Sequence, residues 1–139
     1  MPKYVDPDRT QFEAFKALPR DTPINMLNLI KLNEVALYED GSSCSGLEAY
    51  KRYGEETGPI FSGLGGTIIW RGKPEAILMG PSDEQWDIGF IARYPDAAAF
   101  LAMVTNPDYQ VAVKHRQAAV LTSRLIRFGE LPISENFAH

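Results

Sequence analysis

The chain has 139 residues, which is enough for one domain with a substantial apolar core. Its net charge of -4 provides no basic surface for nucleic acid, and no apolar run reaches the length of a membrane span. The N-terminus lacks the apolar core of a signal peptide and Cys44 has no second cysteine to pair with, so we expect a cytoplasmic protein that partners neither nucleic acid nor membrane.

The first predicted elements are a short helix and a strand. Asp6 as the N-cap and Pro7 at the first helical position predict a helix over residues 6–18. Residues 24–32, INMLNLIKL, predict a strand with apolar side chains on both faces. Asn28 interrupts one of these faces, either as a structural amide whose hydrogen bonds are satisfied or as a polar group in a pocket.

A loop and a longer helix follow. Residues 33–45 contain few signals of regular structure and include an exposed turn at DGSS. A helix is predicted from Ser45 or Gly46 towards Leu64, before two glycines that end it. The hydroxyl groups on its inner side either bond to backbone and water or line a polar pocket. The residues that carry them are Tyr50, Tyr53 and Thr57.

The second half of the chain predicts more strands and a helix in two segments. The stretches TIIWRG and EAILMG predict a hairpin or a bent strand pair, and WDIGFIARY, residues 86–94, predicts the next strand. Pro95 and Asp96 begin a helix that restarts at Asn106-Pro107-Asp108. The last strand is predicted at residues 123–128, and residues 129–139 form a tail.

One charged residue falls on the apolar side of this helix. At 100° per residue, Arg116 lies close in angle to Tyr109 and Val120. A buried guanidinium without a partner is very unfavourable, so Arg116 must extend to the rim, form a structural ion pair or face an anionic ligand in a cleft.

This order of elements predicts the fold class. It corresponds to an α+β, ferredoxin-like βαββαβ antiparallel sheet over residues 24–128, with an extra N-terminal helix, in a single domain of residues 1–139. Helices would cover one face of the sheet. Because the strands are apolar on both faces, something must cover the other face, and a second copy of the chain is the simplest cover. We therefore expect a homodimer.

Three stretches of the chain resemble a known family. TIIWRGKPEAILMGPSDEQWD, RYPDAAAFLAM and PDYQVAVKHR are similar to domain-of-unknown-function family 1330, which belongs to the dimeric α+β barrel superfamily. The matching positions include Trp70, Trp86, Asp87 and Arg116. The resemblance implies a ferredoxin-like fold whose two sheets close into a barrel across a dimer. It implies no particular reaction, because the superfamily includes cofactor-free monooxygenases, isomerases, dehalogenase-like proteins and haem proteins.

The residues give little support to cofactor chemistry. The two histidines, His115 and His139, have no spacing typical of metal or haem ligands. The sequence contains no P-loop, no dinucleotide-binding fingerprint, no nucleophile elbow and no CxxC motif. We therefore expect neither a metal nor a cofactor.

The remaining candidate is a small-molecule cleft between sheet and helices. We expect the substrate-binding residues to be Asn28, Tyr50, Tyr53, Trp70, Arg71 and Trp86. In the first hypothesis the protein is an enzyme acting on a small aromatic or carbonyl compound without a bound cofactor. Arg116 would then hold an anionic oxygen, and His115 or Asp87 would move a proton.

The second hypothesis is a non-catalytic dimeric module that binds a metabolite or a partner protein. Arg116 would then form a structural pair with Asp87 or Glu75, and side chains would fill the cleft. A cavity of ligand size next to Arg116 favours the enzyme, whereas a packed core there favours the module.

Overall fold

A computed structural model describes residues 3–138. Residues 1–2 of the N-terminal segment and His139, the last residue of the predicted tail, lie outside the described residues. The elements follow in the order α1 (Arg9–Ala17), β1 (Ile24–Leu32), β2 (Val35–Leu37), β3 (Ser43–Ser45), α2 (Gly46–Gly63), β4 (Thr67–Gly72), β5 (Ile88–Tyr94), α3 (Ala97–Thr105), α4 (Pro107–Ala119) and β6 (Val120–Gly129).

The main sheet has the topology predicted from the sequence. Its four strands lie in the order β4-β5-β1-β6, and every neighbouring pair is antiparallel. The central strand β1 therefore pairs with β5 on one side and with β6 on the other. In the sequence, α2 connects β1 to β4, and the α3–α4 pair connects β5 to β6. Together with the strand order, this is the ferredoxin-like arrangement, and the predicted fold class is confirmed.

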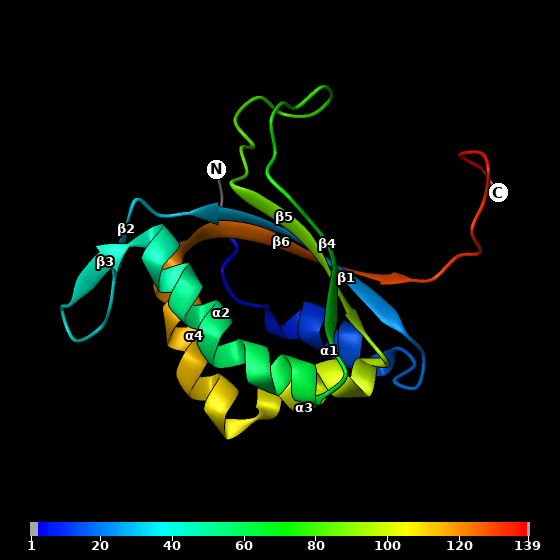
Figure 1. Cartoon of the computed structure of the whole chain (residues 1–139), viewed down its shortest axis with the longest axis horizontal. Helices are drawn as coiled ribbons and strands as arrows, with labels where there is room; N and C mark the ends of the chain where they lie inside the picture. The colour runs from blue at the N-terminus through cyan, green and yellow to red at the C-terminus, as the bar shows by residue number, and fades with distance from the viewer. Residues whose placement is uncertain (1–2, 139) are drawn as a thin grey trace.

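The helices α2, α3 and α4 lie on one side of the sheet (Figure 1). Ser45 caps α2 by accepting a bond from the amide of Glu48 at 3.0 Å. Asn106 caps α4, whose first residue is Pro107, as the sequence predicted. These caps fix where each helix starts, so they also fix which side chains face the sheet.

The core lies between the sheet and these helices. In one cluster Ile24 and Met26 of β1 pack with Phe100 and Met103 of α3. In the other, Ile30 packs with alanines from α2 and α4. Because successive strand residues point to opposite faces, the core-facing set on β1 also includes Asn28.

The N-terminal helix begins later than predicted. It runs from Arg9 to Ala17, and its N-cap is Asp8, whose carboxylate accepts a bond from the Gln11 amide at 2.7 Å. The predicted start at Asp6 is therefore wrong. The DPD sequence offers two equivalent caps, and the Asp6 carboxylate instead accepts a bond from Gln117 of α4 at 3.2 Å.

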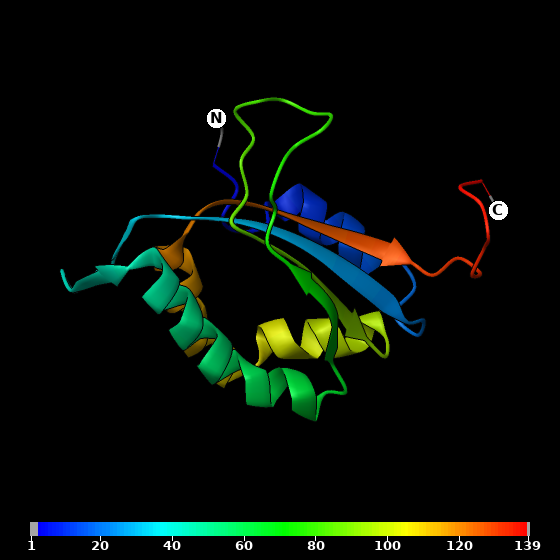
Figure 2. The ribbon, with the colours of Figure 1, turned by 45° about the horizontal axis from the view of Figure 1, so that its top comes forward.

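Two other segments also differ from the prediction. Residues 33–45 contain the short hairpin of β2 and β3, with its turn at Gly41, where φ is +86°. The stretch EAILMG is not a strand but part of the β4–β5 connection, which rises away from the helical layer (Figures 1 and 2). Leu78 and Met79 in this connection are 92% and 89% exposed, so its apolar residues have no cover within the described chain.

The second face of the sheet carries apolar side chains without a covering layer in the monomer. The strand register places Leu27 of β1 beside Ile91 of β5 and Ile126 of β6, and it places Trp70 beside Ile91. Trp70 and Ile126 are 55% and 45% exposed. We call this surface the open face; the two-sided apolar pattern predicted from the sequence corresponds to it.

Candidate functional site

A cavity of about 1100 Å³ lies between the sheet and the helices. This volume is slightly larger than that of most pockets that hold small organic ligands, about 300–1,000 Å³. The walls come from the helical face of the sheet, from α2, from α4 and from the N-terminal segment. Representative lining residues are Asn28, Tyr50, Thr57, Phe90, Tyr109 and Arg116.

Arg116 projects from α4 into the wall of this cavity, as its helical phase predicted. Its guanidinium donates to the backbone carbonyl of Val5, and also to the Ser123 hydroxyl of β6 at 3.2 Å. Within residues 3–138 no carboxylate forms an ion pair with Arg116. Its positive charge is therefore held in place by neutral oxygens, and it remains available to an anion in the cavity.

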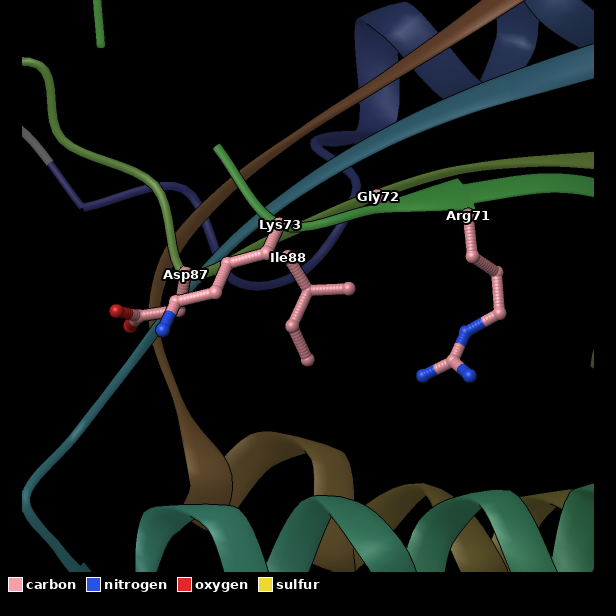
Figure 3. Close-up of a pocket in the computed structure, with 5 residues that line it drawn as sticks. All are labelled: Arg71, Gly72, Lys73, Asp87 and Ile88. Atoms are coloured by element: carbon pink, nitrogen blue, oxygen red, sulfur yellow. The ribbon is translucent and has the colours of Figure 1, made fainter. Parts of the chain in front are cut away.

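A second cation and a tyrosine line the same cavity as Arg116. Arg71 reaches the cavity from β4, and Figure 3 shows its side chain pointing from the strand towards α2. Burial raises the pKa of Tyr50 to about 12, against the opposing effect of the positive charges of Arg116 and Arg71. At neutral pH the Tyr50 hydroxyl is thus protonated and can donate a hydrogen bond beside two guanidiniums.

The remaining hydroxyls of the cavity fall into two groups. Tyr53 of α2 and Tyr109 of α4 share a hydrogen bond of 3.0 Å. The pKa of Tyr53 lies well above its usual value, mainly because the side chain is buried and secondly because Tyr109 is its neighbour. Burial also raises the pKa of Tyr94. Thr57 is 7% exposed, and its hydroxyl has no hydrogen-bond partner among the described residues.

His115 precedes Arg116 on α4, about 100° around the helix from it, and contacts α2 and the segment between β2 and β3. Its Nε2 is 2.6 Å from a Glu56 carboxylate oxygen, and its Nδ1 is 2.6 Å from the Tyr38 hydroxyl. Tyr38 comes from the segment between β2 and β3, so this chain of contacts ties the small hairpin to α2 and α4. His115 does not line the cavity.

Asp87 is also separate from the main cavity. One carboxylate oxygen accepts from the Leu32 amide at 2.8 Å, and the other lies 3.4 Å from the Lys31 ammonium. Figure 3 shows Asp87 beside Lys73 at one end of a smaller depression of about 350 Å³, with Arg71 at the other end. Asp87 thus supports the end of β1 and pairs with Lys31 rather than with Arg116.

The two tryptophans occupy other surfaces. Trp70 lies on the open face, where its ring covers Gly72: a Cβ on that glycine would lie 2.7 Å from the Trp70 ring. The ring of Trp86 stacks with the Arg124 guanidinium at 5.0 Å. Neither tryptophan lines the cavity. Alternation along β4 places Trp70 on the face of the sheet opposite to that of Arg71. Trp86 lies before the first residue of β5, in the β4–β5 connection.

Of the predicted site residues, the structure brings Asn28, Tyr50, Tyr53, Arg71 and Arg116 together around one cavity. Asn28 donates to the Met26 carbonyl at 3.0 Å, which leaves its own carbonyl oxygen free to accept. Asp6 and Tyr109 also line the cavity, although neither was in the predicted set. The helical phase placed Tyr109 beside Arg116, whereas no local signal placed Asp6 near α4.

Over residues 3–138, no group of three or more histidine, cysteine, aspartate or glutamate side chains is arranged to hold a metal ion. In the same part of the chain, no helix combines the length and apolar character required to cross a membrane.

Comparison with known proteins identifies relatives of the same fold. The family model described as "Domain of unknown function (DUF1330)" matches residues 43–127. The RPA0582 protein of unknown function from Rhodopseudomonas palustris is 48% identical, with 95% of this chain and 100% of that chain covered and a TM-score of 0.90. No curated protein matches the chain.

More distant structures share the fold alone. SnoaB from Streptomyces nogalater, described as a cofactor-independent oxygenase, is 14% identical, with 83% of this chain and 99% of that chain covered and a TM-score of 0.54. A protein from Bacteroides fragilis, described as dimeric, of unknown function and with a ferredoxin-like fold, is 13% identical, with 81% of this chain and 100% of that chain covered and a TM-score of 0.50.

Proposed function

The chain belongs to the DUF1330 family, and we propose that it is a cofactor-independent enzyme acting on a small aromatic or carbonyl compound in the cavity between sheet and helices. The observation that carries this proposal is the cavity of about 1100 Å³ beside Arg116. The alternative, a non-catalytic module, requires Arg116 to pair with Asp87 or Glu75 in a filled core. Asp87 instead contacts Leu32 and Lys31, and the space next to Arg116 is open.

The cavity suits a substrate that develops negative charge on oxygen. Guanidiniums held in a site with restricted water stabilise an enolate or phenolate more strongly than water does. Arg116 and Arg71 supply the positive charge, and the protonated Tyr50 hydroxyl can donate a hydrogen bond to the same oxygen. Such a site lowers the pKa of a bound carbonyl compound or phenol, which is the activation that isomerisation or reaction with dioxygen requires.

We propose a proton acceptor other than His115 or Asp87, the residues expected from the sequence. His115 and Asp87 are held by protein partners outside the main cavity. Asp6 is the carboxylate among the residues that line the cavity, and Gln117 donates to it at 3.2 Å. We therefore assign the role of general base to Asp6 and a structural role to His115.

The proposal includes a homodimer formed through the open face. Leu27, Ile91 and Ile126 meet there in register, and exposed Trp70 adds further apolar surface. Covering this face with a second copy would remove the apolar surface from water. The Bacteroides fragilis protein, which shares the fold, is itself described as dimeric. SnoaB, described as a cofactor-independent oxygenase, supports the proposed chemistry by analogy of fold only.

Phenylpyruvate provides a direct test because it has an aromatic ring and a carbonyl group with acidic neighbouring protons. We expect the protein to accelerate the interconversion of its enol and keto forms, measured by the loss of enol absorbance, or to consume dioxygen in an electrode. The Asp6→Asn variant should reduce either rate by about 10²-fold, a typical contribution of a general base. No acceleration and no oxygen uptake would support the non-catalytic module instead.

A further inference from the structure

We infer that the ligand of this cavity is a flat aromatic compound with a carboxylate group, bound with its ring against α2 and its carboxylate at the Arg71–Arg116 end. The inference rests on the proposed function and names its substrate class. Three independent features of the cavity support it: glycines in α2 that the protein itself does not require, a buried hydroxyl without a partner, and two cations without carboxylates.

The first feature is the pair of glycines in the middle of α2. Gly54 and Gly58 line the cavity, one helical turn apart. Glycine is the least favourable helix residue after proline. At Gly46 it is explained by crowding, since a Cβ there would lie 1.8 Å from the Asn33 carbonyl oxygen. At Gly54 and Gly58 a Cβ would meet nothing within 4 Å, so the protein alone gives no steric reason for either glycine.

The absence of side chains at these positions leaves a flat wall of helix backbone. A planar ring can approach such a wall closely, whereas alanine methyl groups would hold it away. Phe90 from β5 and Tyr109 from α4 also line the cavity, so aromatic surfaces are available to contact the ring. This combination favours a flat aromatic ligand over a branched aliphatic one.

The second feature is Thr57, which precedes Gly58 on the same helix. It is 7% exposed, lines the cavity, and its Oγ1 has no hydrogen-bond partner in the described part of the chain. A buried hydroxyl without a partner destabilises a folded protein. A carbonyl or hydroxyl oxygen on the ligand would satisfy it.

The third feature is the charge at the other end of the cavity. Arg116 is fixed by the Val5 carbonyl and the Ser123 hydroxyl, and Arg71 has no carboxylate partner among residues 3–138. Arg71, Arg116 and Tyr50 all line this cavity. Two cations and a donor hydroxyl can bind both oxygens of a carboxylate, and they disfavour a cationic ligand.

Titration calorimetry with 2-naphthoate tests this inference separately from catalysis, because naphthoate has the flat ring and the carboxylate but no enolisable carbonyl. Its uncharged counterpart, 2-naphthamide, has nearly the same shape. We expect naphthoate to bind the wild-type protein at pH 7 at least about tenfold more tightly than naphthamide. The Arg71→Gln variant should remove this preference.

The matched pair Gly58→Ala and Gly63→Ala tests the helix wall. Both positions lie in α2 and have no atom within 4 Å of an added Cβ, but only Gly58 lines the cavity. Each substitution should raise Tm by about 3 °C, because alanine favours the helix. Only Gly58→Ala should weaken naphthoate binding, by about tenfold. Thr57→Val should weaken binding of 6-hydroxy-2-naphthoate, whose hydroxyl lies at the end of the ring away from the carboxylate, more than binding of 2-naphthoate.

The outcomes separate the inference from the proposed function. The inference is overturned if naphthoate does not bind at millimolar concentration, if naphthamide binds equally well, or if Gly58→Ala and Gly63→Ala have the same affinity. Turnover of phenylpyruvate together with any of these results would leave the proposed function intact. Naphthoate binding with the expected pattern but no turnover would support the inference and remove the catalytic proposal.

Discussion

At the scale of single residues, the cavity depends on how Arg116 is held. Its guanidinium joins three segments, since it bonds the Val5 carbonyl of the N-terminal segment and the Ser123 hydroxyl of β6 from its position on α4. The Ser123 hydroxyl in turn donates to the Tyr4 carbonyl at 2.8 Å. Arg116 therefore has structural contacts in addition to the ligand-binding role that we propose for it, and its substitution should affect both.

We predict that Arg116→Ala lowers the free energy of unfolding by about 1–3 kcal/mol, because buried acceptors lose a charged donor. The loss can be measured by urea denaturation. Lys114→Ala on the exposed side of the same helix is the control and should change stability by less than about 0.5 kcal/mol. Equal effects of the two substitutions would show that the contacts of Arg116 contribute nothing to the fold.

Tyr50 provides a prediction for alkaline pH. Burial raises the pKa of Tyr50 to about 12, whereas in the unfolded chain the group titrates near the ordinary tyrosine value of about 10. Above pH 10 the unfolded state therefore loses a proton that the folded state keeps, so stability falls as pH rises from about 10 to about 12. The slope of the unfolding free energy against pH reports the difference in bound protons between the unfolded and folded states. Tyr50→Phe should reduce this difference by about one proton in this range. An unchanged slope would contradict the burial of this hydroxyl.

At the scale of elements, the short β2–β3 hairpin is attached to the helical layer through a line of three side chains. Tyr38 contacts His115 of α4, and His115 contacts Glu56 of α2, each at 2.6 Å. His115 does not line the cavity, so we propose that its role is to position the hairpin and the two helices relative to one another.

Removing the Tyr38 hydroxyl should separate this structural role from catalysis. Tyr38→Phe should lower the free energy of unfolding by about 1 kcal/mol, because one hydrogen bond to a buried group is lost. The rate of phenylpyruvate conversion should stay within a factor of two of the wild-type rate. A large loss of rate in a stably folded Tyr38→Phe variant would instead assign His115 a part in the chemistry.

Much of the fold could be predicted from local patterns because most elements begin at clear caps. Ser45, Asp96 and Asn106 all act as N-caps where the sequence placed helix starts. The errors occur where local patterns are equivocal. Asp6 and Asp8 are equally good caps, and only the contact of Asp6 with Gln117 decides between them. The apolar run EAILMG has a strand-like composition but no neighbouring strand to pair with.

The candidate site was less predictable because it depends on register. Helical phase placed Arg116 of α4 towards the cavity. It also placed Tyr50 and Tyr53 together on the side of α2 that faces the cavity. Trp70 could not be placed in this way, because a β-bulge lies between Ile68 and Trp70 and the face of each strand residue depends on it. The roles of His115 and Asp87 depend on long-range partners, Glu56 and Leu32, that spacing along the chain does not reveal.

At the scale of the whole molecule, the open face is the surface through which we propose that the chain dimerises. Helices cover one face of the sheet, while Leu27, Ile91 and Ile126 form apolar rows on the other. The β4–β5 connection extends from the side of the sheet opposite the helices (Figure 2) and carries exposed Leu78 and Met79. A second copy placed on the open face could contact both surfaces.

We predict that Ile126→Glu converts the dimer into a monomer, because it places a charge among apolar side chains that the partner would bury. Light scattering after size-exclusion chromatography measures the mass. The control is Val111→Glu, at a residue on α4 that is 56% exposed and away from the open face, and it should remain dimeric. If Ile126→Glu also remains dimeric, the partner binds elsewhere.

Native mass spectrometry of the freshly purified protein with added 2-naphthoate tests most directly whether the cavity binds an organic anion. We expect a dimer that takes up one naphthoate per protomer, with much weaker uptake by Arg71→Gln and Gly58→Ala but normal uptake by Gly63→Ala. A ligand-free protein at millimolar naphthoate, or equal uptake by all three variants, would contradict the proposed binding site between the sheet and the helices.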